Sequence, residues 1–270
     1  MKYLLGSKKD GTRTFEKFLI RKIDEENEKE IDNVIDEGQE KIKKGSLPSW
    51  LTSGAAFLFM LGAFILLRSI SDFKQAYANA AWLIYLGAAF IIFAIVVYAI
   101  YLYKSKKLKE NPEIEKLSED IDQKFDEARV ELNIPAEAIK MDILYGIVKE
   151  KNGIEKLDKV AMFNLINLDN YVFVEDGNLC ISDNREVFAF PLDSIKGSEV
   201  VTKRIMLPYW NKDEDIKSEK YHQFNVKTNN YGIVVKPYFK VNFIIDNEEY
   251  YLYVPNYEME AFDKLINLNK

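Results

Sequence analysis

The sequence has few of the residues that usually carry metal and redox chemistry. Cys180 is its only cysteine and His222 its only histidine. A single cysteine cannot form an intrachain disulfide, so nothing in the chain requires an oxidising compartment. The usual tetrahedral zinc sites need three or four Cys or His ligands, and these two residues cannot supply them. We therefore expect no metal and no cofactor.

The chain has no net positive charge, and catalytic motifs are scarce. The net charge of -6 and the isoelectric point near 5.2 argue against a general nucleic-acid binder. The glycines and lysines of Leu5–Thr12 lack the preceding strand and the GK[ST] ending of a phosphate-binding loop. Cys180 and His222 are the residues available for a nucleophile and its base, and no third orienting residue is evident. We expect a protein that is not an enzyme and binds no nucleic acid.

Two long apolar runs dominate the first half of the chain. They cover residues 50–67 and 80–103, and neither contains a formal charge. As helices they would reach about 27 Å and about 36 Å, compared with a hydrocarbon thickness of ~30 Å. The alternative, two buried helices of a soluble core, is disfavoured because such helices nearly always show a polar face. The runs predict a transmembrane hairpin in a lipid bilayer.

Lysines flank the runs, and few basic residues lie between them. The connecting segment 68–79 carries only Arg68 and Lys74. By the positive-inside rule, both termini are then cytoplasmic and the segment is external, as in a multi-pass protein of the cell membrane. The second flank would also attract anionic lipid at the membrane surface, although topology alone accounts for it. The flanking residues are Lys41, Lys43 and Lys44 before the first run, and Lys104, Lys106, Lys107 and Lys109 after the second.

Small residues occur in both runs and would let two helix backbones approach closely. Packing of the two runs against each other is the simpler expectation, and packing against a neighbouring protomer is the alternative. No charged residue lies in mid-membrane, so no proton relay or ion site is evident. The small residues are Gly54, Ala55, Ala56, Gly62 and Ala63 in the first run, and Gly87, Ala88 and Ala89 in the second.

Charged amphipathic segments stand on each side of the runs. Within an N-terminal helical segment at 1–49, apolar spacing predicts a helix over 14–44. In the linker 104–135, Asn111-Pro112 is a helix-start signal, and the helix should end near residues 133–135. The two helices would form an antiparallel stalk, or each would pack onto the C-terminal domain, and the sequence leaves both open.

The residue pattern changes in the C-terminal domain, 136–270, where apolar and polar residues alternate between turn signals. This pattern predicts antiparallel strands followed by a C-terminal helix over 257–268. Pro237 should mark a bulge or an edge position in the longest strand. The predicted strands are 171–175, 179–182, 186–190, 195–203, 221–228, 232–245 and 249–254.

The hairpin NYVFVEDGNLCIS, the passage VFAFPLDSIKGSEV and the final helix together resemble bacterial membrane proteins with a cytoplasmic pleckstrin-homology-like (PH-like) domain. The resemblance covers roughly residues 164–268, while the segment 141–157 has no counterpart in it. It implies an α+β fold with an antiparallel β-barrel or sandwich capped by the last helix, and a binding or scaffolding role. Phosphoinositide recognition does not carry over, because the first hairpin loop reads EDGN and has no basic cluster.

One surface segment stands out in this domain. Two basic residues precede an apolar run and two aromatic residues, in what should be a loop between strands. Tyr and Trp are enriched in protein contacts and at bilayer interfaces. The segment either covers the open end of the barrel or contacts a protein partner or the membrane. The candidate contact residues are Lys203, Arg204, Tyr209, Trp210 and Lys212.

These patterns favour an integral membrane interaction or scaffold protein, with a protein partner or self-association. Its PH-like domain would bind a protein or the membrane surface. The small-residue faces prompt an alternative, an accessory subunit of a membrane transport complex or a small oligomeric channel.

Overall fold

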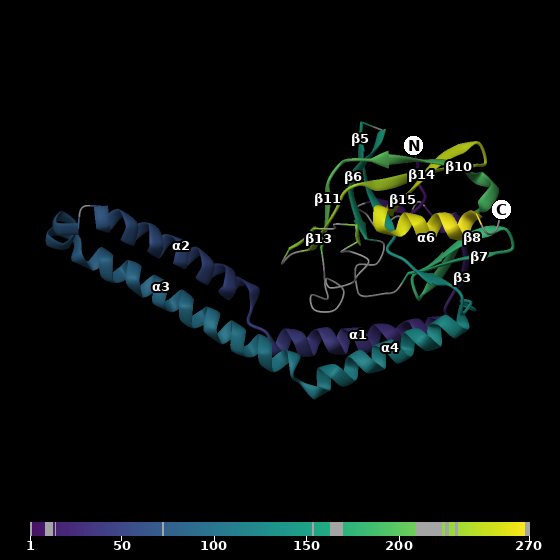
Figure 1. The fold of residues 1–270 in the computed structure, drawn as a ribbon. Helices are drawn as coiled ribbons and strands as arrows, with labels where there is room; N and C mark the ends of the chain where they lie inside the picture. The colour runs from purple at the N-terminus through teal and green to yellow at the C-terminus, as the bar shows by residue number, and fades with distance from the viewer. Residues whose placement is uncertain are drawn as a thin grey trace. The chain divides into compact units, whose positions relative to one another are not determined.

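The computed structural model shows an α+β protein, and its chain divides into two compact units (Figure 1). One unit contains Met1–Glu28 together with Phe125–Lys270, and the other contains Lys29–Lys124. The residues that the structure describes are 2–8, 13, 15–71, 73–152, 154–162, 170–208, 223–224, 227–229 and 232–267.

The two apolar runs lie in the antiparallel helices α2, Ser49–Ser71, and α3, Phe73–Lys109. Both helices are longer than predicted. They include nearly all of the segment 68–79, which was expected to be a loop. This segment contains no glycine or proline that would interrupt a helix. Both are long and apolar enough to cross a membrane, with mean hydropathies of 2.0 and 2.7 in their apolar stretches. Only 11% and 17% of those apolar stretches is buried, unlike the core helices of a soluble protein.

The flanking helices are α1, Glu25–Gly45, and α4, Pro112–Glu131. Ion pairs join them at two levels: Lys124 Nζ lies 2.6 Å from Glu30 Oε2, and Lys41 Nζ lies 3.5 Å from Glu113 Oε2. The start of α1 thus faces the end of α4. Of the two arrangements left open by the sequence, the antiparallel stalk is the one observed along these helices.

Helix α1 begins eleven residues later than the predicted start at Thr14. The Asp24 side chain accepts a hydrogen bond from the backbone N–H of Asn27 at 2.7 Å, which is the geometry of a helix N-cap. The preceding residues Leu19–Lys22 form strand β3 instead. Their apolar spacing fits a helix, but pairing with the distant strand β9, Glu186–Pro191, decides their conformation.

Both predicted ends of α4 are confirmed. The Asn111 side chain accepts a hydrogen bond from the Glu113 N–H at 3.1 Å. At the other end, Ile134 N donates to the Arg129 carbonyl at 3.0 Å, and Asn133 takes a left-handed φ of 51°. Asparagine is one of the few residues that tolerate this helix-terminating conformation.

The described strands of the other unit form three sheets. A seven-stranded sheet has the order β10-β14-β15-β5-β2, and in addition β1 pairs with β15 and β6 pairs with β5. Its strands are β1 Lys2–Tyr3, β2 Gly6–Lys8, β5 Leu144–Lys151, β6 Ile154–Met162, β10 Ile195–Val201, β14 Tyr238–Ile245 and β15 Glu248–Pro255. A five-stranded sheet has the order β3-β9-β8-β7-β4, with β4 Ile139–Lys140, β7 Tyr171–Glu175 and β8 Asn178–Ser182. The third has the order β11-β13-β12: β11 Ile205–Pro208, β12 Lys227–Asn229 and β13 Gly232–Val235.

Most predicted elements of the domain are confirmed, including β7 to β10, β15 and the C-terminal helix α6, Asn256–Asn267. The long predicted strand is divided at Pro237 into β13 and β14, which belong to different sheets. Of the strand predicted over 221–228, only residues 223–224 and 227–228 are described. The segment without a counterpart in the resemblance forms the β5–β6 hairpin.

The expected β-barrel is not observed. Across the described strands the sheets stay separate, so the domain is only loosely sandwich-like. Helix α6 contacts β14 and β15 of one sheet and β7 of another (Figure 1). Its Phe262 is fully buried in the main core with Phe188, Phe190 and Phe243. The helix and this aromatic core, rather than a continuous strand ladder, join the two larger sheets.

The N-terminus is part of this domain, unlike the separate helical segment predicted over 1–49. Strands β1 and β2 pair in parallel with β15 and β5, and β3 pairs antiparallel with β9. Between β1 and β2, Leu4 and Leu5 are 0% and 2% exposed. Two- to four-residue strands have no readable periodicity, so only their distant partners reveal them.

Candidate functional site

Helices α2 and α3 approach each other closely at two glycines, Gly62 and Gly87. A Cβ atom on Gly87 would lie 3.2 Å from the Gly62 carbonyl oxygen and 3.1 Å from the Ile65 side chain. The prediction that small residues pack the two runs against each other is confirmed at these positions. By contrast, a Cβ on Gly54 would meet no atom within 4 Å.

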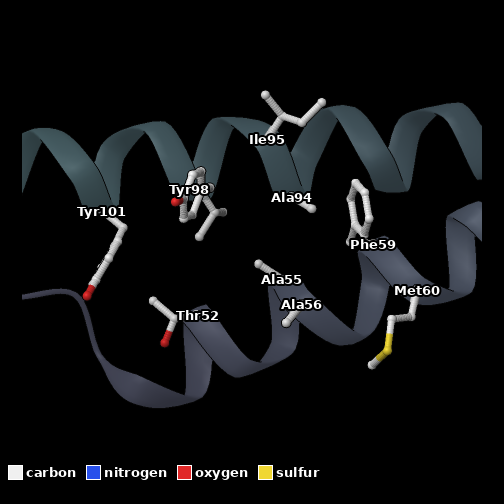
Figure 2. Close-up of a pocket in the computed structure, with 10 residues that line it drawn as sticks. Thr52, Ala55, Ala56, Phe59, Met60, Ala94, Ile95, Tyr98 and Tyr101 are labelled. Atoms are coloured by element: carbon white, nitrogen blue, oxygen red, sulfur yellow. The ribbon is translucent and has the colours of Figure 1, made fainter. Parts of the chain in front are cut away.

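Away from this crossing, the helices enclose a groove of about 570 Å³ (Figure 2). Its floor is formed by Ala55, Ala94 and Val97, which are only 5–6% exposed. Large side chains, including Phe59 and Tyr98, rise at its sides and are mostly open to the surroundings. The lining residues, which define the hairpin groove, are Thr52, Ala55, Ala56, Phe59, Met60, Ala94, Ile95, Val97, Tyr98 and Tyr101.

The groove exists because short side chains occupy the floor while aromatic rings stand at its sides, Phe59 from α2 and Tyr98 and Tyr101 from α3. The rings of Tyr98 and Tyr101 stack on each other with centroids 6.3 Å apart and an interplanar angle of 23°. The Thr52 hydroxyl donates a hydrogen bond to the Ser49 carbonyl at 2.9 Å, so it is satisfied within its own helix. The site is therefore an apolar trough, with two tyrosines at the end nearest Thr52 (Figure 2).

The lysines after the second run lie beyond that end, on the last turns of α3. Lys106 pairs with Glu110 at 3.7 Å, and before the first run Lys44 pairs with Glu40 at 2.7 Å. Lys43, Lys104 and Lys107 make no ion pair within the part of the chain that the structure describes. The Lys109 side chain lies outside that part. Lys104 is one helical turn from Tyr101, so cationic charge follows directly on the apolar groove.

The segment singled out in the β domain is described only at its start. Lys203 and Arg204 are exposed between strands β10 and β11. Tyr209, Trp210 and Lys212 lie outside the described residues. Both interpretations of this segment, a cover for the domain and a contact surface, stay predictions.

The thiol considered as a nucleophile is poorly suited to that role. Cys180 lies in β8 with 1% of its surface exposed, and burial raises the pKa of its thiol to about 11. The thiol is therefore protonated at neutral pH, and the thiolate is the reactive form. His222 lies outside the described residues. Among the residues with a described placement, no three His, Cys, Asp or Glu side chains gather as metal ligands.

A polar cluster closes the turn between β8 and β9. The Asp183 carboxylate accepts hydrogen bonds from the N–H groups of Arg185, at 3.1 Å, and Glu186, at 2.9 Å. Burial, together with the nearby charge of Glu186, raises the pKa of Asp183 to about 6. Arg13, from the N-terminal segment, pairs with Glu186. Because its bonds hold the turn together, this cluster has a structural explanation.

Comparison with protein-family models, curated proteins and solved structures finds no match for this chain. Its function is therefore inferred from its own residues and geometry. The sequence reasoning missed the hairpin groove, because it interpreted Ala55 and Ala56 only as helix-packing residues. The available signal was the repetition of alanines at 55, 56 and 94 beside large aromatic residues.

Proposed function

We propose that this chain is an integral membrane interaction protein, a scaffold that presents a PH-like β domain to a protein partner or the membrane surface in the cytoplasm. The observation that carries the proposal is the exposed surface of α2 and α3. Phe57, Phe64 and Trp82 are each about 60% exposed, at 61%, 60% and 63%. A continuous apolar surface of this kind is unfavourable in water and favourable in a bilayer.

The ends of the helices support the proposed orientation. Trp50 is 72% exposed and Tyr103 is 68% exposed, and both lie next to the lysine-rich flanks. Aromatic rings favour the headgroup region, and lysines are retained on the cytoplasmic side. Both flanks, and with them both termini, are then cytoplasmic.

The binding role rests on the resemblance to PH-like domains and on one edge of the β domain. Strand β10 pairs with β14 and has no second partner strand among the described residues. Lys203 and Arg204 follow this strand directly and are exposed. An open strand edge next to cationic side chains suits an extended acidic segment of a partner protein.

The alternative, a transport accessory subunit or small channel, keeps less support. It was prompted by small residues on the helix faces, and Gly62 and Gly87 are already used in the contact between α2 and α3. We therefore rank it second.

Alkaline extraction and cysteine labelling test the anchor. In a Cys180→Ser background, single cysteines are introduced as Lys74→Cys, at the start of α3, and Lys151→Cys, at the end of β5. We expect the chain to stay with membranes at alkaline pH, and an impermeant maleimide to label position 74 in intact cells and position 151 only after lysis. Release from the membrane would refute the anchor, and the reverse labelling pattern would refute the orientation.

Site-specific crosslinking tests the binding role. A photoreactive residue replaces Arg204, and a matched chain carries it at Lys264, an exposed residue of α6. Irradiation of native membranes should give a discrete protein adduct from position 204 that position 264 does not give. Identical adduct patterns from the two positions would count against a partner at this edge.

A further inference from the structure

We propose that the hairpin groove holds one acyl chain of an anionic phospholipid, with the phosphate headgroup against the lysines at the end of α3. The inference rests on the proposed membrane location and adds a defined ligand to it. The bound lipid is then a stoichiometric ligand, distinct from the lipids that surround any membrane helix.

The length of the groove fits a chain from one leaflet. From Thr52 to Met60, α2 advances about 12 Å at 1.5 Å per residue. One leaflet contributes about 15 Å, half of the ~30 Å hydrocarbon thickness. The groove begins two residues after Trp50, at the expected interface, so it runs from the headgroup level towards the middle of the bilayer.

The lining matches the chemistry of a lipid along its length. Alanine, isoleucine, methionine and phenylalanine side chains line the part nearer Phe59 and Met60 and offer no polar group to a ligand (Figure 2). Tyr98 and Tyr101 lie nearer the interface, where their hydroxyls are placed to donate hydrogen bonds to ester or phosphate oxygens. The volume of about 570 Å³ is within the usual range of ~300–1,000 Å³ for ligand sites.

The lysines at the end of α3 select an anionic headgroup by their charge. Lys104 lies one turn beyond Tyr101, and Lys107 lies one turn further. Neither makes an ion pair with the described residues, in contrast to Lys106 with its partner Glu110. Two cations without an acidic partner among the described residues, on the turns of α3 just beyond an apolar groove, complement a phosphodiester with no other charge. A second copy of this chain or a foreign helix would fill the groove without using these charges.

Lipid competition on the purified full-length protein tests the proposal. The protein in a mild detergent is mixed with equal amounts of phosphatidylglycerol and phosphatidylcholine of the same acyl chains, and retained lipid is counted by native mass spectrometry. We expect one phosphatidylglycerol per chain to be retained at least tenfold over phosphatidylcholine. Equal retention of the two lipids would overturn the proposal.

Two pairs of variants separate the acyl and headgroup contributions. Ala56→Leu fills the groove and should lower retention of both lipids, whereas Ala89→Leu, on an exposed part of α3 outside the groove, should leave retention unchanged. The double variant Lys104→Gln/Lys107→Gln should lower phosphatidylglycerol retention by about fivefold per lysine and leave phosphatidylcholine unchanged. Its control is Lys151→Gln/Lys156→Gln, two exposed lysines of the β5–β6 hairpin.

The outcomes also distinguish the two proposals. A chain that stays in membranes but binds no lipid selectively refutes only the lipid site. A chain that leaves the membrane at alkaline pH refutes the anchor on which the site depends. A dimer that Ala56→Leu dissociates, with no selective lipid retention, would assign the groove to a second copy and overturn the lipid proposal.

Discussion

A Cβ atom on Gly62 would lie 2.7 Å from the carbonyl oxygen of Gly87. This distance is shorter than any ordinary contact, so any side chain at position 62 would clash with the backbone of α3. The contact holds α2 against α3 within one chain and so positions the walls of the hairpin groove.

Gly62→Ala should therefore push the helices apart and destabilise the hairpin by about 1–3 kcal/mol, the usual cost of overpacking. Gly54→Ala is the matched control, because its Cβ would meet no atom and alanine is the better helix former. The free energy of unfolding of the detergent-solubilised protein measures both. Equal stabilities for the two variants would contradict the observed crossing.

Asp183→Asn should stabilise the β domain in a pH-dependent way. Burial raises the pKa of Asp183 from 3.8 to about 6, so the folded state binds the proton more tightly than the unfolded state does. The folded state therefore loses stability relative to the unfolded state as the pH rises from about 4 to 6, and this loss is complete above pH 6. Asparagine keeps the turn-closing acceptor and removes the charge.

We expect Asp183→Asn to gain up to about 3 kcal/mol at pH 8 and nothing at pH 4, as measured by unfolding at each pH. Asp176→Asn, at an exposed turn position that asparagine also tolerates, is the control. A gain of the same size at both pH values would mean that charge burial is not the cause.

Ile31→Ala in α1 should cost about 2–4 kcal/mol, because Ile31 is 2% exposed and its truncation leaves a cavity. Ile42→Ala, on the same helix but 45% exposed, should cost about 0.5 kcal/mol or less. Chemical denaturation followed by circular dichroism compares them. Ile31 and Ile42 are eleven residues apart and so lie on the same face of α1. If Ile42→Ala were the more damaging, burial of the side chain would not be what makes Ile31 important.

Leu5→Ala should destabilise the β domain by about 2–5 kcal/mol although it lies far from that domain in the sequence. Leu19→Ala, 37% exposed in β3, should cost much less. Limited proteolysis of the full chain, with cleavage scored within the C-terminal domain, gives the readout. Faster cleavage of that domain in Leu5→Ala alone would support the pairing of the two chain ends.

Local patterns predicted the helices and hairpins of this chain well. The Asn111-Pro112 start of α4 and the strand Tyr171–Glu175 follow from residues close in sequence, and both were located correctly. The split of the strand predicted over 232–245 and the role of residues 1–28 were not predicted. Both depend on pairing between distant segments, which one sequence does not display.

The candidate site also has features that the sequence predicted and features that it did not. The apolar runs and flanking lysines follow from composition, so two helices long and apolar enough to cross a membrane were predicted from the sequence. The groove between α2 and α3 was not, because it depends on how far each alanine lies from the opposite helix. Glycine and alanine carry the same sequence signal whether they close a contact, as Gly62 does, or leave a space, as Ala56 does.

The pairing of β1, β2 and β3 with strands from the other end of the chain has a consequence for biosynthesis. The first 28 residues leave the ribosome early, but their partner strands are made only after both apolar helices have emerged. The N-terminal segment therefore lacks its partner strands, and Leu4 and Leu5 lack their cover, until those strands have been made. If the hairpin spans the membrane as proposed, completion of the domain depends on both of its flanks reaching the same side, and a hairpin inserted halfway would leave the two parts of the domain on opposite sides.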